Sequence, residues 1–144
     1  MKRRNIIWAA AILALLMFTR CHFIAWPLRR ADAVITVKTT GYCACPKCSG
    51  WKFNWFGLPV THKGDAKVIG QTSGMRMARP GTVAVDPTGF PLGTKFYIPG
   101  YGWGRAGDVS DVEGRHLDLY FWQHSSAKKW GEQTKTVKVW YPRT

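Results

Sequence analysis

The stretch "GDVSDVEGRHLDLYF", residues 107–121, joins a segment rich in turn-forming residues to a segment with the pattern of a β-strand. It holds four of the eight acidic residues of a chain that also has 21 Lys and Arg residues. From residue 115 onward apolar and polar side chains alternate, which is typical of a strand with one buried face. We therefore expect Leu117 and Leu119 to face a core and Asp118 to face the other side.

Strand-like composition recurs after the N-terminal region, and turn residues separate the segments. We expect one all-β domain over residues 34–144, with about six strands and one short helix. The helix is expected in residues 124–133, with Ser125 as N-cap and Gly131 near its end. Residues 43–67 are rich in Gly, Pro and Trp, so they are expected to form a long loop. The strand-like segments include residues 34–42, 81–87, 93–102, 115–121 and 134–142.

The N-terminal region has the features of an export segment. The basic "MKRRN" precedes an uncharged apolar run from Ile6 to Phe18, and "ADA" follows at 31–33. Residues 1–33 are therefore expected to be a signal peptide or a membrane anchor, and cleavage is left open. A buried core helix is the alternative. We expect an exported, periplasmic, membrane-anchored or cell-wall-associated protein.

The net positive charge of residues 34–144 limits the classes of molecule that the protein is expected to bind. Residues 34–144 contain 15 basic and 7 acidic side chains. Such a surface favours anionic partners, but export makes nucleic acid an unsuitable one. Contact with a membrane is expected only through the N-terminal segment. The sequence gives no indication of the oligomeric state and none of a cofactor.

Three cysteines lie close together in "CACPKC". Export favours a disulfide among Cys43, Cys45 and Cys48, with the pairing unknown. Free thiols are one alternative. Structural zinc is another, since C-x-x-C is a zinc-ligand spacing, but only His62 is near in sequence and we expect no metal. His124 is expected to cap the helix or to pack locally.

Asp118 has the features of a catalytic acid. A carboxyl beside apolar and aromatic surface loses hydration, so its pKa rises and it keeps a proton near neutral pH. Asp108 lies ten residues upstream across a turn, and Asp86 ends the strand-like segment 81–87. The alternative is that each is an exposed polar residue. Asp111 and Glu113 are expected to be turn residues.

An ordered set of segments resembles the 3D domain, which is named for three aspartates and occurs in bacterial cell-wall lytic transglycosylases. The similarity extends over roughly residues 36 to 141, and "TTGYCACPKCSGWKFNWFG" and "GQTSG" are similar to the family's N-terminal portion. The segments are "VAVDP" (83–87), "PLGTKFYIPGYGWGRAGD" (91–108), "EGRHLDLYF" (113–121), "HSSAKKWG" (124–131) and "KTVKVW" (135–140).

This resemblance implies a six-stranded double-psi β-barrel and places the family aspartates on Asp86, Asp108 and Asp118. It implies that the protein cleaves β-1,4 bonds of peptidoglycan glycan strands and leaves 1,6-anhydromuramic ends. Asp118 would then be the general acid and base. Asp108 would bond to Asp118 and keep its pKa high, and Asp86 would do the same or stabilise positive charge on the sugar.

Sugar binding needs flat rings and hydroxyl-pairing groups. Thr72 and Ser73 match a Thr/Ser-Gly turn of the family and are expected to contact substrate. Tyr42, Tyr101 and Gly102 are further candidates for substrate binding. Trp51, Trp55 and Trp103 are ring candidates that could equally belong to the core.

The resemblance fails at "DVSDVEG", residues 108–114. The family usually has a Gly-Gly turn, an apolar pair and Lys-Gly after the second aspartate. A peptidoglycan-binding module without catalysis, or a glycan hydrolase that uses water, is therefore the alternative function.

Overall fold

The computed structural model describes residues 29–111 and 114–143. The predicted export segment lies almost entirely outside them, at residues 1–28, and so does Glu113. The chain divides into two compact units, Met1–Arg30 and Ala31–Thr144, and the second contains every described helix and strand. None of the described helices has the length and hydropathy needed to cross a membrane.

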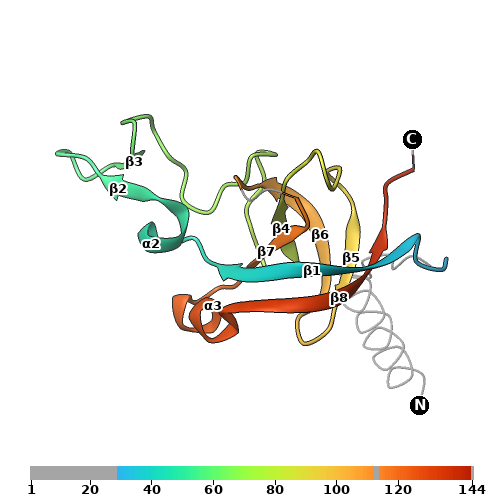
Figure 1. Ribbon diagram of the computed structural model, residues 1–144. Helices are drawn as coiled ribbons and strands as arrows, with labels where there is room; N and C mark the ends of the chain where they lie inside the picture. Colours follow the sequence, from blue (N-terminus) through green and yellow to red (C-terminus); the bar gives the residue numbers. More distant parts are fainter. Residues whose placement is uncertain (1–28, 112–113, 144) are drawn as a thin grey trace, which may run out of the picture. The chain divides into compact units, whose positions relative to one another are not determined.

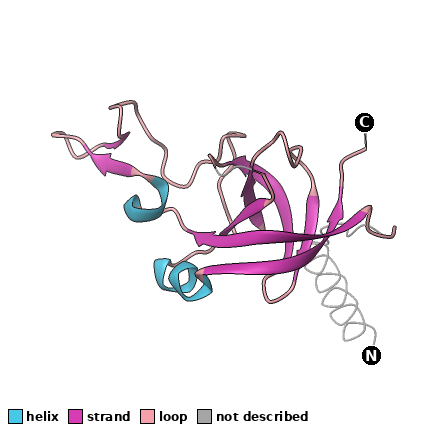
Figure 2. Ribbon diagram, in the orientation of Figure 1, coloured by secondary structure: helices cyan, strands magenta, loops and turns pink. Residues whose placement is uncertain are grey.

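Six strands close into a mixed barrel in the order β1-β7-β4-β6-β5-β8 (Figures 1 and 2). Two neighbouring pairs, β1 with β7 and β4 with β6, are parallel, and the other four pairs are antiparallel. The six are β1 (Ala33–Tyr42), β4 (Thr82–Val85), β5 (Lys95–Ile98), β6 (Gly102–Val109), β7 (His116–Tyr120) and β8 (Glu132–Trp140).

Side chains that alternate along these strands fill the barrel. The prediction for β7 is confirmed, because Leu117 and Leu119 are completely buried. Burial of each such side chain contributes about 1.5–3 kcal/mol. The core consists of Val37, Val83, Val85, Phe90, Phe96, Ile98, Ala106, Leu117, Leu119, Val137 and Val139.

The sequence gives no clear signal for β6, which is rich in glycine. Gly104 has a packing reason, because a Cβ there would lie 2.5 Å from Cγ2 of Val83 on the neighbouring strand. A side chain at this position would collide with the core. The glycines allow β6 to pack closely against β4. The same glycines remove the alternating sequence pattern by which a strand is recognised.

Two helices and a small hairpin complete the described fold. The expected helix is α3 (His124–Trp130), which starts before Ser125, has Gln123 as its N-cap and ends at Gly131. The segment expected to be one long loop instead contains α2 (Pro46–Ser49), β2 (Trp51–Phe53) and β3 (Pro59–Thr61). The expectation of a single short helix was therefore wrong. Figure 1 shows β2 and β3 outside the barrel.

Candidate active site

A cleft of ≈ 630 Å³ lies on the outer face of the barrel. Ala84 on β4 is paired with Asp108 on β6 and with Asp118 on β7, so the two aspartates flank it. Residues 43–80 supply the facing wall. We call this site the carboxylate cleft; besides these three residues its lining includes Tyr42, Ala44, Cys48, Ser49, Gly50, Lys67, Gln71, Thr72, Ser73, Ser110, Asp111 and Tyr120.

Strand alternation explains why Asp118 faces the cleft. Its neighbours Leu117 and Leu119 occupy the core, so the carboxyl must point outward. Burial under the cleft wall raises the pKa of Asp118 above its ordinary value. The Thr40 hydrogen bond and the His116 charge act against this rise, and the Asp108 charge adds to it. Asp118 is thus favoured to keep its proton, as a general acid must.

Thr40 connects Asp118 to His116. The Thr40 hydroxyl donates to Asp118 Oδ1 at 2.8 Å, and its oxygen lies 2.8 Å from Nε2 of His116. Because that hydroxyl proton points to the carboxyl, the Thr40 oxygen can accept from an N–H at Nε2. His116 therefore shares the face of Asp118 and reaches it through Thr40, although it is not part of the cleft lining. Burial lowers the pKa of His116.

Asp108 is held by donors of its own. The backbone N–H groups of Ser73 and Val109 donate to Oδ1 at 2.8 and 2.9 Å, and the Tyr42 hydroxyl donates to Oδ2 at 3.4 Å. Because β4 separates β6 from β7, the two strands are about 10 Å apart. Asp108 thus acts on Asp118 through its charge, and the expected hydrogen bond between the two carboxyls is not formed.

The structure places Asp86 away from this pair. Its Oδ1 accepts hydrogen bonds from the backbone N–H and the hydroxyl of Thr88, at 2.9 and 2.7 Å, and its Oδ2 accepts from the Gly114 N–H at 3.4 Å. These bonds, led by the Thr88 hydroxyl, lower the pKa of Asp86. Asp86 does not line the carboxylate cleft. Its hydrogen bonds thus belong to the turn after β4, and the structure does not bring it together with Asp108 and Asp118.

Three of the five expected sugar-binding residues line the cleft. Tyr42 is close to both aspartates, and burial, followed by the charges of Asp108 and Asp118, raises the pKa of its hydroxyl. Thr72 is buried, and its Oγ1 accepts from the Arg76 N–H at 3.3 Å. The Ser73 hydroxyl accepts from the Val109 N–H at 3.0 Å, and the Ser73 N–H donates to Asp108. These two hydrogen bonds attach the loop that contains Ser73 to β6.

Tyr101 and Gly102 do not line the cleft. Tyr101 packs against the core, where its hydroxyl donates to the Tyr120 carbonyl at 2.8 Å and accepts from the Gly81 N–H at 2.9 Å. Burial raises the pKa of Tyr101 to about 12. Gly102 begins β6 with a φ of +98°, a conformation that favours glycine. The structure therefore does not bring Tyr101 and Gly102 together with the other expected sugar-binding residues.

The tryptophan candidates are also separate from the cleft lining. Trp51 is buried, and its Nε1 donates to the Ala44 carbonyl at 2.8 Å. Trp55 is 95% exposed between β2 and β3. Trp103 stacks on Trp140 with ring centroids 4.8 Å apart. Of the aromatic candidates, Tyr42 alone lines the cleft in the part of the chain that the structure describes.

The cysteines of "CACPKC", for which a disulfide of unknown pairing was expected, are unpaired in the described structure. Cys43, Cys45 and Cys48 are free thiols, and all three lie near His124, not His62. Burial raises the pKa of Cys43 to about 12. Burial also acts to raise the pKa of Cys45, but hydrogen bonds from Cys43, from Cys48 and from backbone N–H groups lower it to about 7.

Several residues that line the cleft or contact Asp118 were missed from the sequence. Thr40 sits in "VKTTGY", where nothing distinguishes it from any other strand threonine, and Ala84 carries no functional group. Lys67 and Gln71 line the cleft from a loop whose path the sequence does not reveal. Asp111, expected to be only a turn residue, lies at the exposed edge of the cleft.

A comparison with known families matches the part of the chain that carries this pair of aspartates. The family model of the 3D domain matches residues 81–142, which contain β4 to β8 and the pair Asp108 and Asp118. The chain is a 3D domain protein, as the resemblance in its sequence indicates.

Two relatives come from Bacillus subtilis (strain 168). YabE, named as a cell wall shaping protein, is 36% identical over 108 residues, which are 74% of this chain and 23% of YabE. YocH, named as a cell wall-binding protein, is 41% identical over 58 residues, which are 40% of this chain and 20% of YocH. The chain thus spans less than a quarter of the length of either relative.

Proposed function

We propose that this protein is a lytic transglycosylase of the bacterial cell wall, with a barrel of double-psi topology, and that it acts outside the cytoplasm on peptidoglycan glycan strands. The observation that carries the proposal is Asp118, a carboxyl whose pKa is raised by burial inside a cleft. The names of the two relatives support a cell-wall partner.

In the first step Asp118 donates its proton to the oxygen of the β-1,4 bond. The C1–O bond then breaks, and positive charge develops on the muramic acid ring as the leaving sugar departs with the proton. The neighbouring Asp108 carboxylate favours this step in two ways. Its charge helps keep Asp118 protonated before the reaction, and it stabilises positive charge in the cleft afterwards.

In the second step the C6 hydroxyl of the same sugar attacks C1. Its proton passes to the Asp118 carboxylate, which restores the acid and yields a 1,6-anhydro end without water. One carboxyl thus serves both steps. Thr40 holds Oδ1 of Asp118 at 2.8 Å, so the other oxygen, Oδ2, remains to face the substrate.

The cleft walls supply partners for a sugar chain. Thr72, Ser73 and Gln71 offer polar groups, Tyr42 offers a ring, and Lys67 offers a positive charge to carboxylates of the peptidoglycan. Asp86 has no part in this mechanism, because its bonds to Thr88 and Gly114 fix it in a turn outside the cleft.

Two observations favour other functions for the same cleft. YocH is named as a cell wall-binding protein, which favours a binding module without catalysis. The separation of Asp108 from Asp118 by one strand favours a hydrolase, since it leaves room for a water molecule that Asp108 could activate.

Release of soluble muropeptides from purified sacculi tests catalysis against binding alone. The wild-type protein is expected to release them, and Asp118→Asn is expected to lose the release by at least about 100-fold while still sedimenting with the sacculi. Asp111→Asn is the matched control at the cleft edge and is expected to stay active. If the wild type binds sacculi and releases nothing, or if Asp118→Asn is fully active, the proposal fails.

A further inference from the structure

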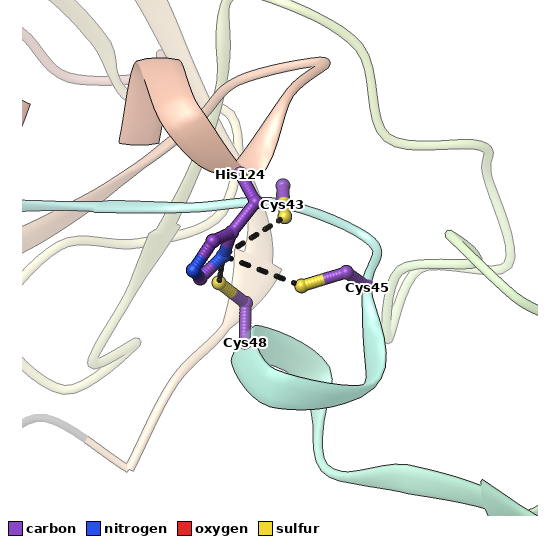
Figure 3. A group of neighbouring side chains, drawn as sticks. All are labelled: Cys43, Cys45, Cys48 and His124. Carbon is purple, nitrogen blue, oxygen red and sulfur yellow. Dashed lines mark hydrogen bonds between the residues drawn. The ribbon is translucent and has the colours of Figure 1, made fainter. Parts of the chain in front are cut away.

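Four metal-ligating side chains meet beside the end of β1, outside the mechanism above (Figure 3). Cys43 follows β1 directly, Cys45 and Cys48 belong to the turn that forms α2, and His124 is the first residue of α3. Figure 3 shows all four side chains pointing toward one another from these separate segments. Their three sulfur atoms and the ligand nitrogen lie within 4.8 Å of one another.

The distances have the size of a metal coordination shell. Nδ1 of His124 lies 3.9 Å from Sγ of Cys43, 3.5 Å from Sγ of Cys45 and 3.3 Å from Sγ of Cys48. A tetrahedral zinc ion with ordinary bond lengths puts sulfur and nitrogen ligands about 3.5 Å apart and two sulfurs about 3.8 Å apart. A disulfide would instead bring two of the sulfurs to about 2.05 Å.

We propose that Cys43, Cys45, Cys48 and His124 bind a zinc ion. Three soft thiolates and one imidazole in a tetrahedral arrangement suit Zn²⁺ better than Mg²⁺ or Ca²⁺, which prefer oxygen ligands. All four positions of the shell are taken by protein atoms, so no position is open for water or substrate. The site is therefore structural and stands apart from the chemistry at Asp118.

The local backbone supports this ligand set. Pro46 opens α2 directly after Cys45, and Gly50 ends it in the left-handed conformation with a φ of +57°. The backbone N–H groups of Cys48 and Ser49 donate to the Cys45 carbonyl at 3.1 and 2.9 Å, which closes the turn directly after Cys45. The four-residue helix thus serves to present Cys45 and Cys48 to one point.

The metal would fix one wall of the carboxylate cleft. Ala44, Ser49 and Gly50 line the cleft, as Cys48 itself does, and they belong to the segment that the ion would tie to α3. Between residues 43 and 80 the chain adds no residue to the barrel core, and its buried apolar side chains are few: Cys43, Trp51, Val60 and Ala78. A bound ion would therefore add to the limited apolar packing of this wall. This role holds whether the cleft cleaves glycans or only binds them.

Metal analysis of the full-length chain tests the proposal. A Cys21→Ser background leaves only the three cysteines of the cluster. After dialysis against micromolar zinc and then against metal-free buffer, this protein is expected to keep about one zinc per chain. His124→Ala is expected to bind zinc at least about 100-fold more weakly. His62→Ala is the matched control, since His62 lies near Gly50 but outside the cluster, and it is expected to keep the ion.

Two further measurements keep the test decisive if His124→Ala folds poorly. His124→Cys restores a four-ligand set and is expected to bind zinc again. Cobalt in place of zinc is expected to give the visible absorption of a tetrahedral thiolate site. The proposal is overturned if the background protein keeps no zinc, if His124→Ala keeps it as tightly as His62→Ala, or if the intact chain has lost the mass of two hydrogens to a disulfide.

Discussion

Replacing Asp118 with asparagine should stabilise the folded protein at neutral pH while removing its activity. The amide has the shape of the carboxyl, and its Oδ1 can still accept the Thr40 hydrogen bond at 2.8 Å. What changes is the charge. Burial raises the pKa of Asp118, so the ionised form is less stable in the folded protein than in the unfolded chain.

The pH dependence follows from that direction. Below the pKa of an unfolded aspartate, about 3.9, both states hold the proton and the carboxyl costs nothing. As the pH rises, the unfolded chain ionises first, and the free energy of unfolding of the wild type falls until the pH passes the folded pKa. The amide of the Asp118→Asn variant does not titrate. The variant should therefore match the wild type near pH 3 and exceed it at pH 7.

The magnitude is modest, because Asp118 still opens onto the water of the carboxylate cleft. A single stabilising substitution typically adds about 0.5–2 kcal/mol to the free energy of unfolding. For a domain of about 110 residues this corresponds to a rise in Tm of about 2–8 °C at pH 7. Loss of the Thr40 hydrogen bond would cost about 1 kcal/mol of stability. Because the asparagine keeps this bond, the gain is not reduced by that cost.

Thermal unfolding at pH 3, 5 and 7, followed by circular dichroism, measures the effect. Asp111→Asn serves as the control, because Asp111 is exposed at the edge of the same cleft and should leave Tm nearly unchanged at each pH. A variant at position 118 that is less stable than the wild type at pH 7, or equally stabilised at pH 3 and pH 7, would refute the reasoning.

Three further changes test other parts of the account. Thr40→Val removes a hydrogen bond that lowers the pKa of Asp118, so that pKa should rise. The alkaline limb of the pH profile of murein release should then move to higher pH, and no movement would argue against Asp118 as the acid. Asp86→Asn should keep murein release within about twofold. It should lose stability at pH 7 but not at low pH in urea titrations, because the lowered pKa makes ionised Asp86 stabilising only above the unfolded pKa. Gly41→Ala should cost about 1–3 kcal/mol of unfolding free energy in the same titration, because its Cβ would lie 2.8 Å from the Ala127 carbonyl oxygen; unchanged stability would contradict this packing.

Alternation along single strands was the part of the structure that sequence could predict well. In β7 it placed Leu117 and Leu119 in the core and Asp118 on the outer face, which the structure confirms. It could not show that Asp108 and Asp118 flank Ala84 in the same cleft, because that depends on β6. The glycines of β6 have no strand pattern, although its pairing with β4 brings Asp108 to the cleft.

The remaining site depended on contacts between distant segments. Thr40 is 78 residues from Asp118 and His124 is 76 residues from Cys48, so no spacing in the sequence relates them. His62 was considered as a metal ligand only because it is near in sequence. Tyr101 was considered for sugar binding because it is an aromatic residue among turn residues, but its ring and hydroxyl are both used by the core.

The chemical end of the released muropeptides tests the central claim most directly. Purified sacculi are digested with the wild-type protein, and the soluble products are separated and weighed by mass spectrometry before and after borohydride reduction. A transfer to the sugar's own C6 hydroxyl predicts 1,6-anhydromuramic ends, which lack one water and resist reduction. Products that carry reducing ends would show that water is the acceptor, and they would contradict the account of Asp118 as both acid and base.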